Sequence, residues 1–458
     1  MSTNGPKSFL QDMPAIAAAK LAAQGSHLAG KQGTSLPGKT ALAISPSVLR
    51  DLAGQVKKKI FVVCGTNGKT TTNNLLCGML EDTGAKVICN RLGANMLWGV
   101  TGAFVEAAGL SGRLEADYAC LEVDEASAPG VLSHIKPDYL ILTNLFRDQL
   151  DRYGEIDITI RLLLQAIREV PEMKLIVNAD DPLLVYLAQE SGNPYVCYGI
   201  NEPVPAAHPG HKDSKEVGTE VREGRFCKRC GALLDYSFYH FAQMGDYHCS
   251  SCEFARPTPE YTFSRISLEE GVSFAAEGRQ FKTHMEGLYS IYNLLAVWSA
   301  LKESGNSCER FGEVLQTARP QFGRNEIFRI GDCEIHLNLA KNPTGFNQNI
   351  EAMLEDGKPK DLIITINDNA QDGTDISWLW DVEFERIRAS QIRSVTVTGI
   401  RALDMRLRLK YEEIGSQIAA TPEEAIRQKL AEGTKNLYVL VNYTALFSIH
   451  QYLQRREK

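Results

Sequence analysis

The stretch "FVVCGTNGKTTTNNLL", residues 61–76, constrains the fold more than any other part of the chain. We expect an apolar strand to run into a turn that contains Gly65 and Gly68, with a threonine-rich helix directly after it. Glycine accepts positive φ angles and lets backbone amides approach an anion closely. The turn is therefore predicted to cradle phosphate oxygens. The predicted phosphate-binding residues are Gly65, Thr66, Asn67, Gly68, Lys69, Thr70 and Thr71.

Two side chains of this turn have distinct predicted roles. Lys69 is predicted to bridge the outer phosphates, and the hydroxyl of Thr70 is predicted to bind Mg²⁺ at the start of the helix. The general phosphate-loop pattern has a glycine five residues before Gly68, where this chain has Val63. A simple strand-to-helix turn is the alternative, but the preceding strand and the following helix favour a phosphate loop.

Short apolar strands alternate with helical stretches in two series, over about 57–200 and over 330–458. This alternation predicts an α/β fold in which parallel sheets are flanked by helices. The predicted strands are "KIFVVCG", "DYACLEVDE", "DYLILTN" and "KLIVNAD" in the first series, and "EIHLNLA", "DLIITIND", "IRSVTVTGI" and "KNLYVLVNY" in the second.

Three units are predicted along the chain. A helical segment over 1–56, which the loop "GKQGTSLPGKT" interrupts, precedes a phosphate-loop domain over 57–320. Residues 201–224 are rich in proline, glycine, histidine and charged residues, and they predict a loop that leads into an insertion over 218–258. A C-terminal Rossmann-like α/β domain is predicted over 321–458.

Composition excludes some classes of partner. The net charge of −7 argues against a nucleic-acid-binding surface. No apolar run approaches the roughly 20 residues that a membrane span needs. The alanine-rich N-terminus lacks the basic region and apolar core of a signal peptide. We therefore expect a cytoplasmic protein with no transmembrane segment and no nucleic-acid partner.

Two cysteine pairs, "CKRC" and "CSSC", are separated by eighteen residues. This spacing is typical of a zinc site with four thiolate ligands, joined here by a hairpin. Because all four positions are cysteine, no position remains for water, and a structural rather than catalytic site is predicted. A pair of redox motifs is the alternative. The predicted zinc ligands are Cys227, Cys230, Cys249 and Cys252.

Three carboxylates, Glu122, Asp124 and Glu125, lie where the predicted strand "DYACLEVDE" leaves its sheet. Ligands gather at the carboxyl edge of open α/β sheets, and a carboxylate there can complete the coordination of Mg²⁺. An ordinary solvated acidic loop is the alternative.

Six motifs occur in an order and spacing that resemble the Mur ligases, to which folylpolyglutamate synthases are related. They are "GTNGKTT", "LEV", "TNLFRDQLDRYG", "NADDP", "GLYSIYNLLA" and "GRNE". Mur ligases are ATP-dependent, amide-forming enzymes of peptidoglycan synthesis. In that family ATP phosphorylates a carboxylate acceptor, and an amine then attacks the acyl phosphate.

The resemblance implies roles for five residues. Lys69 and Thr70 would hold the triphosphate and Mg²⁺, and Glu122 would be a metal ligand and part of the catalytic site. Asn293 would approach the adenine, and Arg324 would contact the nucleotide from the domain junction.

The chain also departs from the family pattern. Gln149 stands where members commonly have histidine, and Leu163 stands where many have a carbamylated lysine. Both departures weaken the expectation of a second metal site. Residues 1–56 are too few for the usual domain that binds a UDP-sugar, so the expected acceptor is not a free UDP-linked precursor.

The cysteine pairs, the short N-terminal segment and the stretch "NDNAQDGTDISWLWD", residues 367–381, resemble an amidating branch of the Mur ligases. The resemblance implies a ligase that forms carbon–nitrogen bonds with glutamine as nitrogen donor. It would convert the D-glutamyl α-carboxylate of lipid II to D-isoglutamine, at the inner face of the membrane. A separate glutaminase subunit of the GatD type would supply the ammonia, and an aspartate of the ligase chain would complete its catalytic triad.

Asp368 is the predicted triad residue, because a strand end holds a carboxylate rigidly enough to orient an imidazole. Asp372 and Asp375 lie on the following loop, where helix capping or solvation is the alternative role. Trp378 and Trp380 form either an apolar face for a partner or part of the core.

Two other functions remain open at this stage. One is a Mur or folylpolyglutamate-type ligase that adds an amino acid to a carboxylate; the missing lysine and the missing UDP-binding domain disfavour it. The other is a zinc-ribbon ATPase that acts as a scaffold, which the acidic composition and the Mur-type motifs disfavour.

Overall fold

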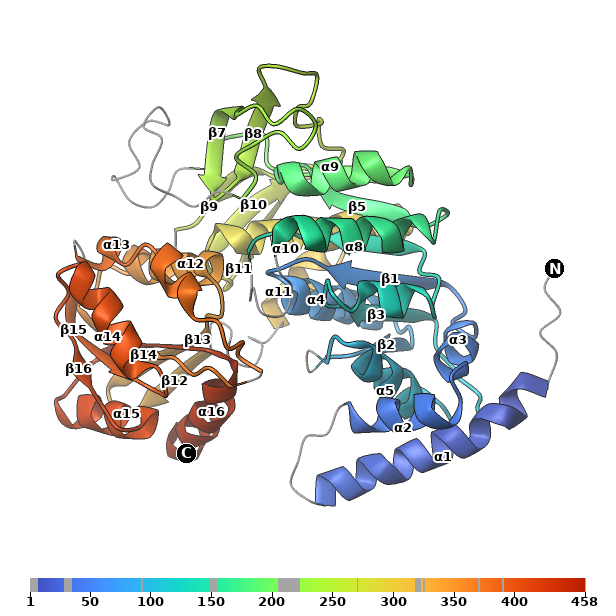
Figure 1. The fold of residues 1–458 in the computed structure, drawn as a ribbon, viewed down its shortest axis with the longest axis horizontal. Helices are drawn as coiled ribbons and strands as arrows, with labels where there is room; N and C mark the ends of the chain where they lie inside the picture. Colours follow the sequence, from blue (N-terminus) through green and yellow to red (C-terminus); the bar gives the residue numbers. More distant parts are fainter. Residues whose placement is uncertain are drawn as a thin grey trace.

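The computed structural model describes residues 7–28, 35–91, 94–147, 155–204, 223–269, 271–317, 323, 326–369, 371–388 and 391–457. Two six-stranded sheets, each flanked by helices, form the two halves of the molecule (Figure 1). The predicted α/β fold with parallel sheets is therefore confirmed.

The first sheet has the strand order β2-β3-β1-β4-β5-β6, and every pair in it is parallel. Its strands are β1 (Lys59–Cys64), β2 (Val87–Cys89), β3 (Tyr118–Glu122), β4 (Tyr139–Leu142), β5 (Lys174–Asn178) and β6 (Tyr195–Tyr198). The sequence predicted four of these strands. It missed β2 and β6, because apolar runs this short carry no period that separates strand from helix.

Strand β1 lies in the middle of this sheet and contributes to two cores. Ile60, Val62 and Cys64 belong to the hydrophobic cluster on one face, and Phe61 and Val63 belong to the cluster on the other. Successive strand side chains point to opposite faces, so a continuous apolar run fits a strand that is covered on both sides. This burial fixes the register of β1 and hence the position of the loop that follows it.

The N-terminal helices share the core of the first sheet. Ile16, Ala41 and Leu49 are fully buried in the same cluster as Val62, and these helices lie along one side of the sheet (Figure 1). The helices of this half are α1 (Lys7–Leu28), α2 (Leu36–Ile44), α3 (Val48–Ala53), α4 (Lys69–Asp82), α5 (Leu97–Ala107), α6 (Ala128–Leu132), α8 (Ile156–Arg168), α9 (Pro182–Ser191), α10 (Leu288–Glu303) and α11 (Phe311–Thr317).

One predicted loop is partly wrong. The last five residues of "GKQGTSLPGKT", 36–40, form the first part of α2 instead. Pro37 sits in the first turn of this helix, where the missing N–H costs nothing because it has no intrahelical partner anyway.

The second sheet has the order β12-β13-β17-β14-β15-β16. The four predicted strands of this half are its four parallel central strands, and β12 pairs antiparallel at one edge. The strands are β12 (Glu326–Ile330), β13 (Cys333–Leu339), β14 (Lys360–Thr365), β15 (Ile392–Thr398), β16 (Gln417–Ile418) and β17 (Asn436–Val441). The helices are α12 (Pro343–Glu355), η1 (Ser377–Asp381), α13 (Glu385–Arg388), α14 (Ala402–Tyr411), α15 (Pro422–Ala431) and α16 (Tyr443–Glu457).

Two small antiparallel units follow β6 in the chain. The first is the hairpin of β7 (Leu234–Phe241) and β8 (Met244–Cys249), which lies within the predicted insertion. The second is a three-stranded sheet that the sequence did not predict, made of β9 (Ser264–Ser267), β10 (Val272–Ala276) and β11 (Arg279–Thr283).

The two halves touch beside the phosphate loop. Asn342 donates a hydrogen bond from Nδ2 to Oδ1 of Asn67 at 3.3 Å, and Arg147 forms an ion pair with Asp381 at 3.2 Å. The boundaries at 56/57 and 320/321 stay predictions. Within the described residues, no helix is both long and apolar enough to cross a membrane.

Gly38 allows close packing between α2 and α5. A Cβ on Gly38 would lie 1.8 Å from the carbonyl oxygen of Trp98, whereas a Cβ on Gly78, inside α4, would meet nothing within 4 Å. We expect Gly38→Ala to lower the free energy of unfolding by about 1–3 kcal/mol, because backbone must shift to make room. Gly78→Ala is the matched control and should be neutral or stabilising by a few tenths of a kcal/mol to about 1 kcal/mol.

Urea titration followed by circular dichroism measures both variants. A Gly38→Ala protein as stable as wild type would show that the contact between α2 and α5 is looser than the structure indicates.

Candidate active site

The loop after β1 has the geometry that a phosphate cradle needs. Gly65 and Gly68 have φ angles of 129° and 83°, and α4 begins at Lys69. A Cβ on Gly65 would lie 2.3 Å from Oγ1 of Thr143, and a Cβ on Gly68 would lie 2.1 Å from Oδ1 of Asn293. Both glycines are therefore required, for their positive φ and for the close approach of neighbours.

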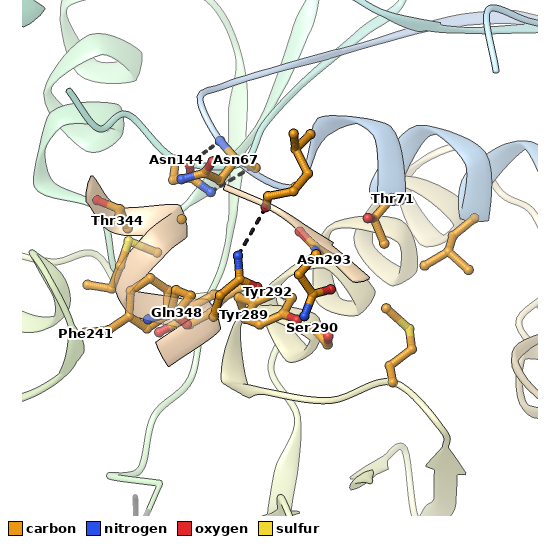
Figure 2. A pocket seen from close by; sticks show the side chains of 18 of the residues that line it. Asn67, Thr71, Asn144, Phe241, Tyr289, Ser290, Tyr292, Asn293, Thr344 and Gln348 are labelled. Carbon is orange, nitrogen blue, oxygen red and sulfur yellow. Dashed lines mark hydrogen bonds between the residues drawn. The ribbon is translucent and has the colours of Figure 1, made fainter. Parts of the chain in front are cut away.

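Asn67 is held by the end of β4. Its backbone N–H donates to Oδ1 of Asn144 at 2.8 Å, and its carbonyl accepts from Asn144 Nδ2 at 3.0 Å and Thr143 Oγ1 at 2.8 Å. Figure 2 shows Asn67 and Asn144 facing each other at the edge of a cavity. Among the described residues, Nδ2 of Asn67 is a buried donor without a partner, which suits it to an anionic ligand.

Lys69 is a buried cation. Its Nζ lies 3.0 Å from Oε2 of Glu125, and it also donates to the carbonyl of Gly65. Burial disfavours the charged ammonium, but the carboxylates of Glu125, Asp124 and Glu122 outweigh it and hold the pKa of Lys69 above its ordinary value. The side chain is therefore charged at neutral pH and fixed at the mouth of the loop.

The three carboxylates at the end of β3 and directly after it are buried, so the alternative of a solvated acidic loop is wrong. Glu122, Asp124 and Glu125 are each less than 5% exposed. Oε1 of Glu122 accepts from Asn95 Nδ2 at 2.9 Å, whereas Oε2 is buried without a hydrogen-bond partner among the described residues. A buried carboxylate oxygen without a donor is costly, and a hard cation such as Mg²⁺ fits it.

A cavity of about 200 Å³ lies beside the loop (Figure 2). Asn293, on α10, lines it and contacts Gly68, so the structure brings this predicted residue to the phosphate loop. Side chains from both halves and from the tip of the β7–β8 hairpin form its walls. They include Asn67, Thr71, Asn144, Phe146, Phe241, Met244, Tyr289, Tyr292, Asn293, Asn338, Thr344 and Gln348.

Other predicted positions lie elsewhere. Arg324 and Gln149 are outside the described residues. Leu163 lies on α8 and is fully buried in the core of the first half, as expected for an apolar residue at that position. Thr70 lies in the first turn of α4, next to Lys69.

The four predicted zinc ligands converge at one end of the hairpin. Their sulfur atoms all lie within 4.8 Å of one another, and the pairs Cys227–Cys252 and Cys230–Cys249 are each 3.5 Å apart. Four sulfurs at about 2.3 Å from one tetrahedral ion lie roughly 3.8 Å apart, so the group fits zinc. The N–H of Ser251 donates to the Cys249 sulfur and helps to lower the pKa of this thiol to about 7, which favours the thiolate.

The three aspartates after β14 have different surroundings. Asp368 is half-buried and pairs with Arg401, whose Nη2 lies 2.6 Å from Oδ2. Asp372 is buried and accepts from the backbone N–H of Thr444 at 2.8 Å, and Asp375 accepts from the N–H of Ser377 at 2.8 Å at the start of η1. Asp372 therefore joins its loop to the start of α16, Asp375 binds the first residue of η1, and Asp368 holds a carboxylate near the surface.

The two tryptophans of this stretch also differ in their exposure to solvent. Trp378 is buried in the core of the second half, whereas Trp380 is half-exposed and packs edge-on against Tyr411.

Several residues of the cavity were not singled out in the sequence. Asn144 and Tyr292 lie inside motifs that were recognised, "TNLFRDQLDRYG" and "GLYSIYNLLA", but no pattern shows which of their side chains turns inward. Phe241 and Met244 lie in the stretch between the cysteine pairs, and only the folded hairpin brings them to the cavity.

Two family models match the chain. The Mur ligase middle domain matches residues 63–231, and the MurT ligase C-terminal domain matches residues 339–446. The solved structure of a pseudomurein peptide ligase type C from Methanothermus fervidus is 21% identical, with a TM-score of 0.64, and the match covers 88% of this chain and 80% of that one. Fold and site thus define a protein of the Mur ligase class.

Relatives with higher sequence identity identify the family within this class. The lipid II isoglutaminyl synthase (glutamine-hydrolyzing) subunit MurT of Staphylococcus aureus is 35% identical over 449 residues, which cover 97% of this chain and 98% of the relative. The subunit of the same name from Streptococcus pneumoniae is 34% identical over 445 residues, 95% of this chain and 96% of the relative. The chain belongs to the MurT family.

The unpartnered oxygen of Glu122 generates a prediction. Glu122→Gln should leave the unfolding temperature without ligand within a few degrees of wild type, because the amide keeps the bond from Asn95 and removes a buried charge. The variant should lose most of the extra stabilisation that ATP gives when Mg²⁺ is present, because a metal ligand is gone. Thermal unfolding with ATP, with and without Mg²⁺, measures this.

Glu115→Gln is the matched control, since the side chain of Glu115 is 72% exposed. A Glu122→Gln protein that keeps the full Mg²⁺-dependent stabilisation would remove Glu122 from the metal site.

Proposed function

We propose that this chain is the ligase subunit of a lipid II isoglutaminyl synthase. It transfers the γ-phosphoryl group of ATP to the α-carboxylate of the D-glutamyl residue of lipid II and releases ADP. Ammonia then attacks the acyl carbon and loses a proton, the bond between that carbon and the phosphate oxygen breaks, inorganic phosphate leaves, and D-isoglutamine forms. The full-length match to subunits of this name, together with the buried lysine at the phosphate loop, carries the proposal.

Each residue of the site has a task in this reaction. The backbone amides from Gly65 to Thr71 bind the triphosphate, and the Lys69 ammonium stabilises the charge that moves onto the β–γ bridge. Glu125 and the carbonyls of Gly65 and Thr66 accept from this ammonium and keep it at the loop, and its donors would turn to the phosphate oxygens when ATP binds. Asn293 would approach the adenine, and the resemblance to the Mur ligases assigns a nucleotide contact to Arg324, which lies outside the described residues.

Glu122 and Thr70 would hold Mg²⁺. When bound, the ion neutralises phosphate charge and polarises the γ-phosphoryl group. The buried Oε2 of Glu122 supports this role, because no donor among the described residues competes for it.

Zinc is proposed as a structural ion. Cys227, Cys230, Cys249 and Cys252 supply four sulfurs in a group whose size fits a tetrahedral ion, and no ligand position is left for a reacting molecule. Metal binding of this kind contributes folding free energy to a small unit with little core of its own.

Glutamine hydrolysis is assigned to a separate glutaminase subunit of the GatD type. Strand β14 ends at Thr365, so Asp368 lies three residues beyond the strand end expected from the sequence. Asp368 is proposed to complete the catalytic triad of that subunit, because Arg401 already orients its carboxylate. The lipid-linked acceptor implies that the complex works at the inner face of the membrane.

The mass of lipid II tests the proposed reaction. With ATP, Mg²⁺ and ammonium, we expect this chain to lower the mass of lipid II by about one unit, since an amide replaces a carboxyl hydroxyl. Lys69→Ala should abolish the shift, because the β–γ bridge loses its cation. Lys59→Ala is the matched control, because Lys59 begins β1, the strand that precedes the phosphate loop, and forms a half-exposed surface pair with Asp138.

Turnover of ATP with unchanged lipid II would point to another acceptor and overturn the proposal. Full activity of Lys69→Ala would overturn the assignment of the phosphate loop.

Asp368 is tested by comparing nitrogen sources. In the complex with the glutaminase, Asp368→Asn should suppress glutamine-driven amidation by at least about a hundredfold, since a triad without its carboxylate loses the correct imidazole tautomer. Ammonium-driven amidation should persist. Asp375→Asn, on the same loop, should change neither rate.

Equal loss with both nitrogen sources would place Asp368 in the ligase site instead. A selective loss in Asp375→Asn would move the triad role to that residue.

A further inference from the structure

The β7–β8 hairpin links the cysteine cluster to the cavity. In its antiparallel ladder Leu234 pairs with Cys249 at one end, and Phe241 pairs with Met244 at the other. Six residues of β8 span about 17 Å. The hairpin therefore has a metal-binding end, which carries the cysteines, and a tip, residues 241–244.

The tip is fastened to the carboxyl edge of the first sheet. Gln243 is fully buried, and its Nε2 donates to the carbonyl of Leu145 at 2.6 Å. The N–H of Gly245 donates to the carbonyl of Asp180 at 3.0 Å. These bonds hold the hairpin on the loops that follow β4 and β5, where ligands gather in α/β sheets.

Two residues of the tip are walls of the cavity beside the phosphate loop. Met244 is fully buried and Phe241 is partly exposed, and both line the cavity together with Asn293. Figure 2 shows Phe241 and Asn293 at this cavity. The Phe241 ring packs edge-on against Tyr292 with 5.9 Å between ring centroids, and lies 6.3 Å from Phe146. This aromatic wall faces the same space as Gly68 and Thr71 of the phosphate loop.

A buried polar chain ties the same wall to the body of the domain. Tyr292 donates to Oδ2 of Asp180 at 2.6 Å, and Asp180 pairs with Arg256 at 2.7 Å. His240, next to Phe241 in the hairpin, lies 2.6 Å from the hydroxyl of Tyr292. Phe241 thus packs against a tyrosine whose own position is fixed by hydrogen bonds.

The cysteine end packs on a small apolar cluster, and Lys228 joins it to Asp157 of α8 by an ion pair at 2.5 Å. Its small cluster joins Cys227, Leu234, Tyr247 and Phe254 to Val185 of α9. Four thiolates come this close only around a cation, so metal binding would fix the geometry of this end of the hairpin.

We propose that the tip of the hairpin is part of the nucleotide site, with Phe241 and Met244 as an apolar wall for the purine base, and that the metal at the cysteine end keeps this wall in place. The inference rests on the proposed use of ATP and adds a base-contacting residue to it. Phe241 contacts the substrate in this proposal, and the cysteines act through the hairpin as positioning residues.

Dissociation constants for two ligands test whether Phe241 contacts the purine base. Titration calorimetry with ADP and, separately, with inorganic tripolyphosphate, both with Mg²⁺, compares wild type with Phe241→Ala. Loss of an aromatic ring from a base is expected to weaken ADP binding about tenfold. Tripolyphosphate has no base, so its affinity should stay within twofold. Phe226→Ala is the matched control, because this phenylalanine of the same insertion is 55% exposed and does not line the cavity.

The metal is tested in the same titration. Wild-type protein stripped of zinc by a chelator, with its metal content measured, should bind ADP several-fold more weakly and recover when zinc is returned. If Phe241→Ala binds ADP as tightly as wild type, Phe241 is not part of the base site. If the metal-free protein binds ADP as tightly as the zinc-loaded protein, the metal does not position Phe241. If the wild-type protein does not bind ADP, the proposed function as an ATP-dependent ligase is wrong. The comparison of Phe241→Ala with wild type tests the contact between Phe241 and the base even if the metal-free protein unfolds.

Discussion

The buried pair of Lys69 and Glu125 is the interaction on which the site depends. The lysine starts α4 and the glutamate follows β3, so the pair joins two neighbouring strand ends of the first sheet. A buried ammonium without a counter-charge would lose its proton or its position, because burial disfavours charge. The parallel pairing of β1 and β3 is what brings the carboxylates within reach. The position and the charged state of Lys69 therefore depend on the strand pairing as well as on the phosphate loop.

Much of this could be predicted from the sequence, and for local reasons. The phosphate loop, the cysteine spacing and the strand-helix alternation are patterns in which neighbouring residues carry the whole signal. The strands β1, β3, β4, β5, β13, β14, β15 and β17 were expected, and the structure contains them. A motif of this kind specifies its own backbone, so no knowledge of distant contacts is needed.

The remainder depends on contacts between segments far apart in the chain. The burial of Glu122, Asp124 and Glu125 is decided by what packs over them, and a run of acidic residues in a sequence does not reveal its cover. The same holds for Phe241 and for the contact between Asn67 and Asn342, which lie 275 residues apart. Short strands such as β2 and the three-stranded sheet of β9–β11 were missed because they are too short, or too irregular, to show a period.

The shared core of the N-terminal helices has a consequence for how the chain can be divided. Val100 and Phe104 of α5 are fully buried in the cluster that also contains Ala41 and Leu49. A fragment that began at the phosphate-loop strand would bring these side chains into water and leave an apolar face with no cover. Such a fragment would self-associate before it bound any ligand, since large exposed apolar patches promote aggregation. Fusion partners and affinity tags are therefore better joined ahead of α1 than at the start of β1.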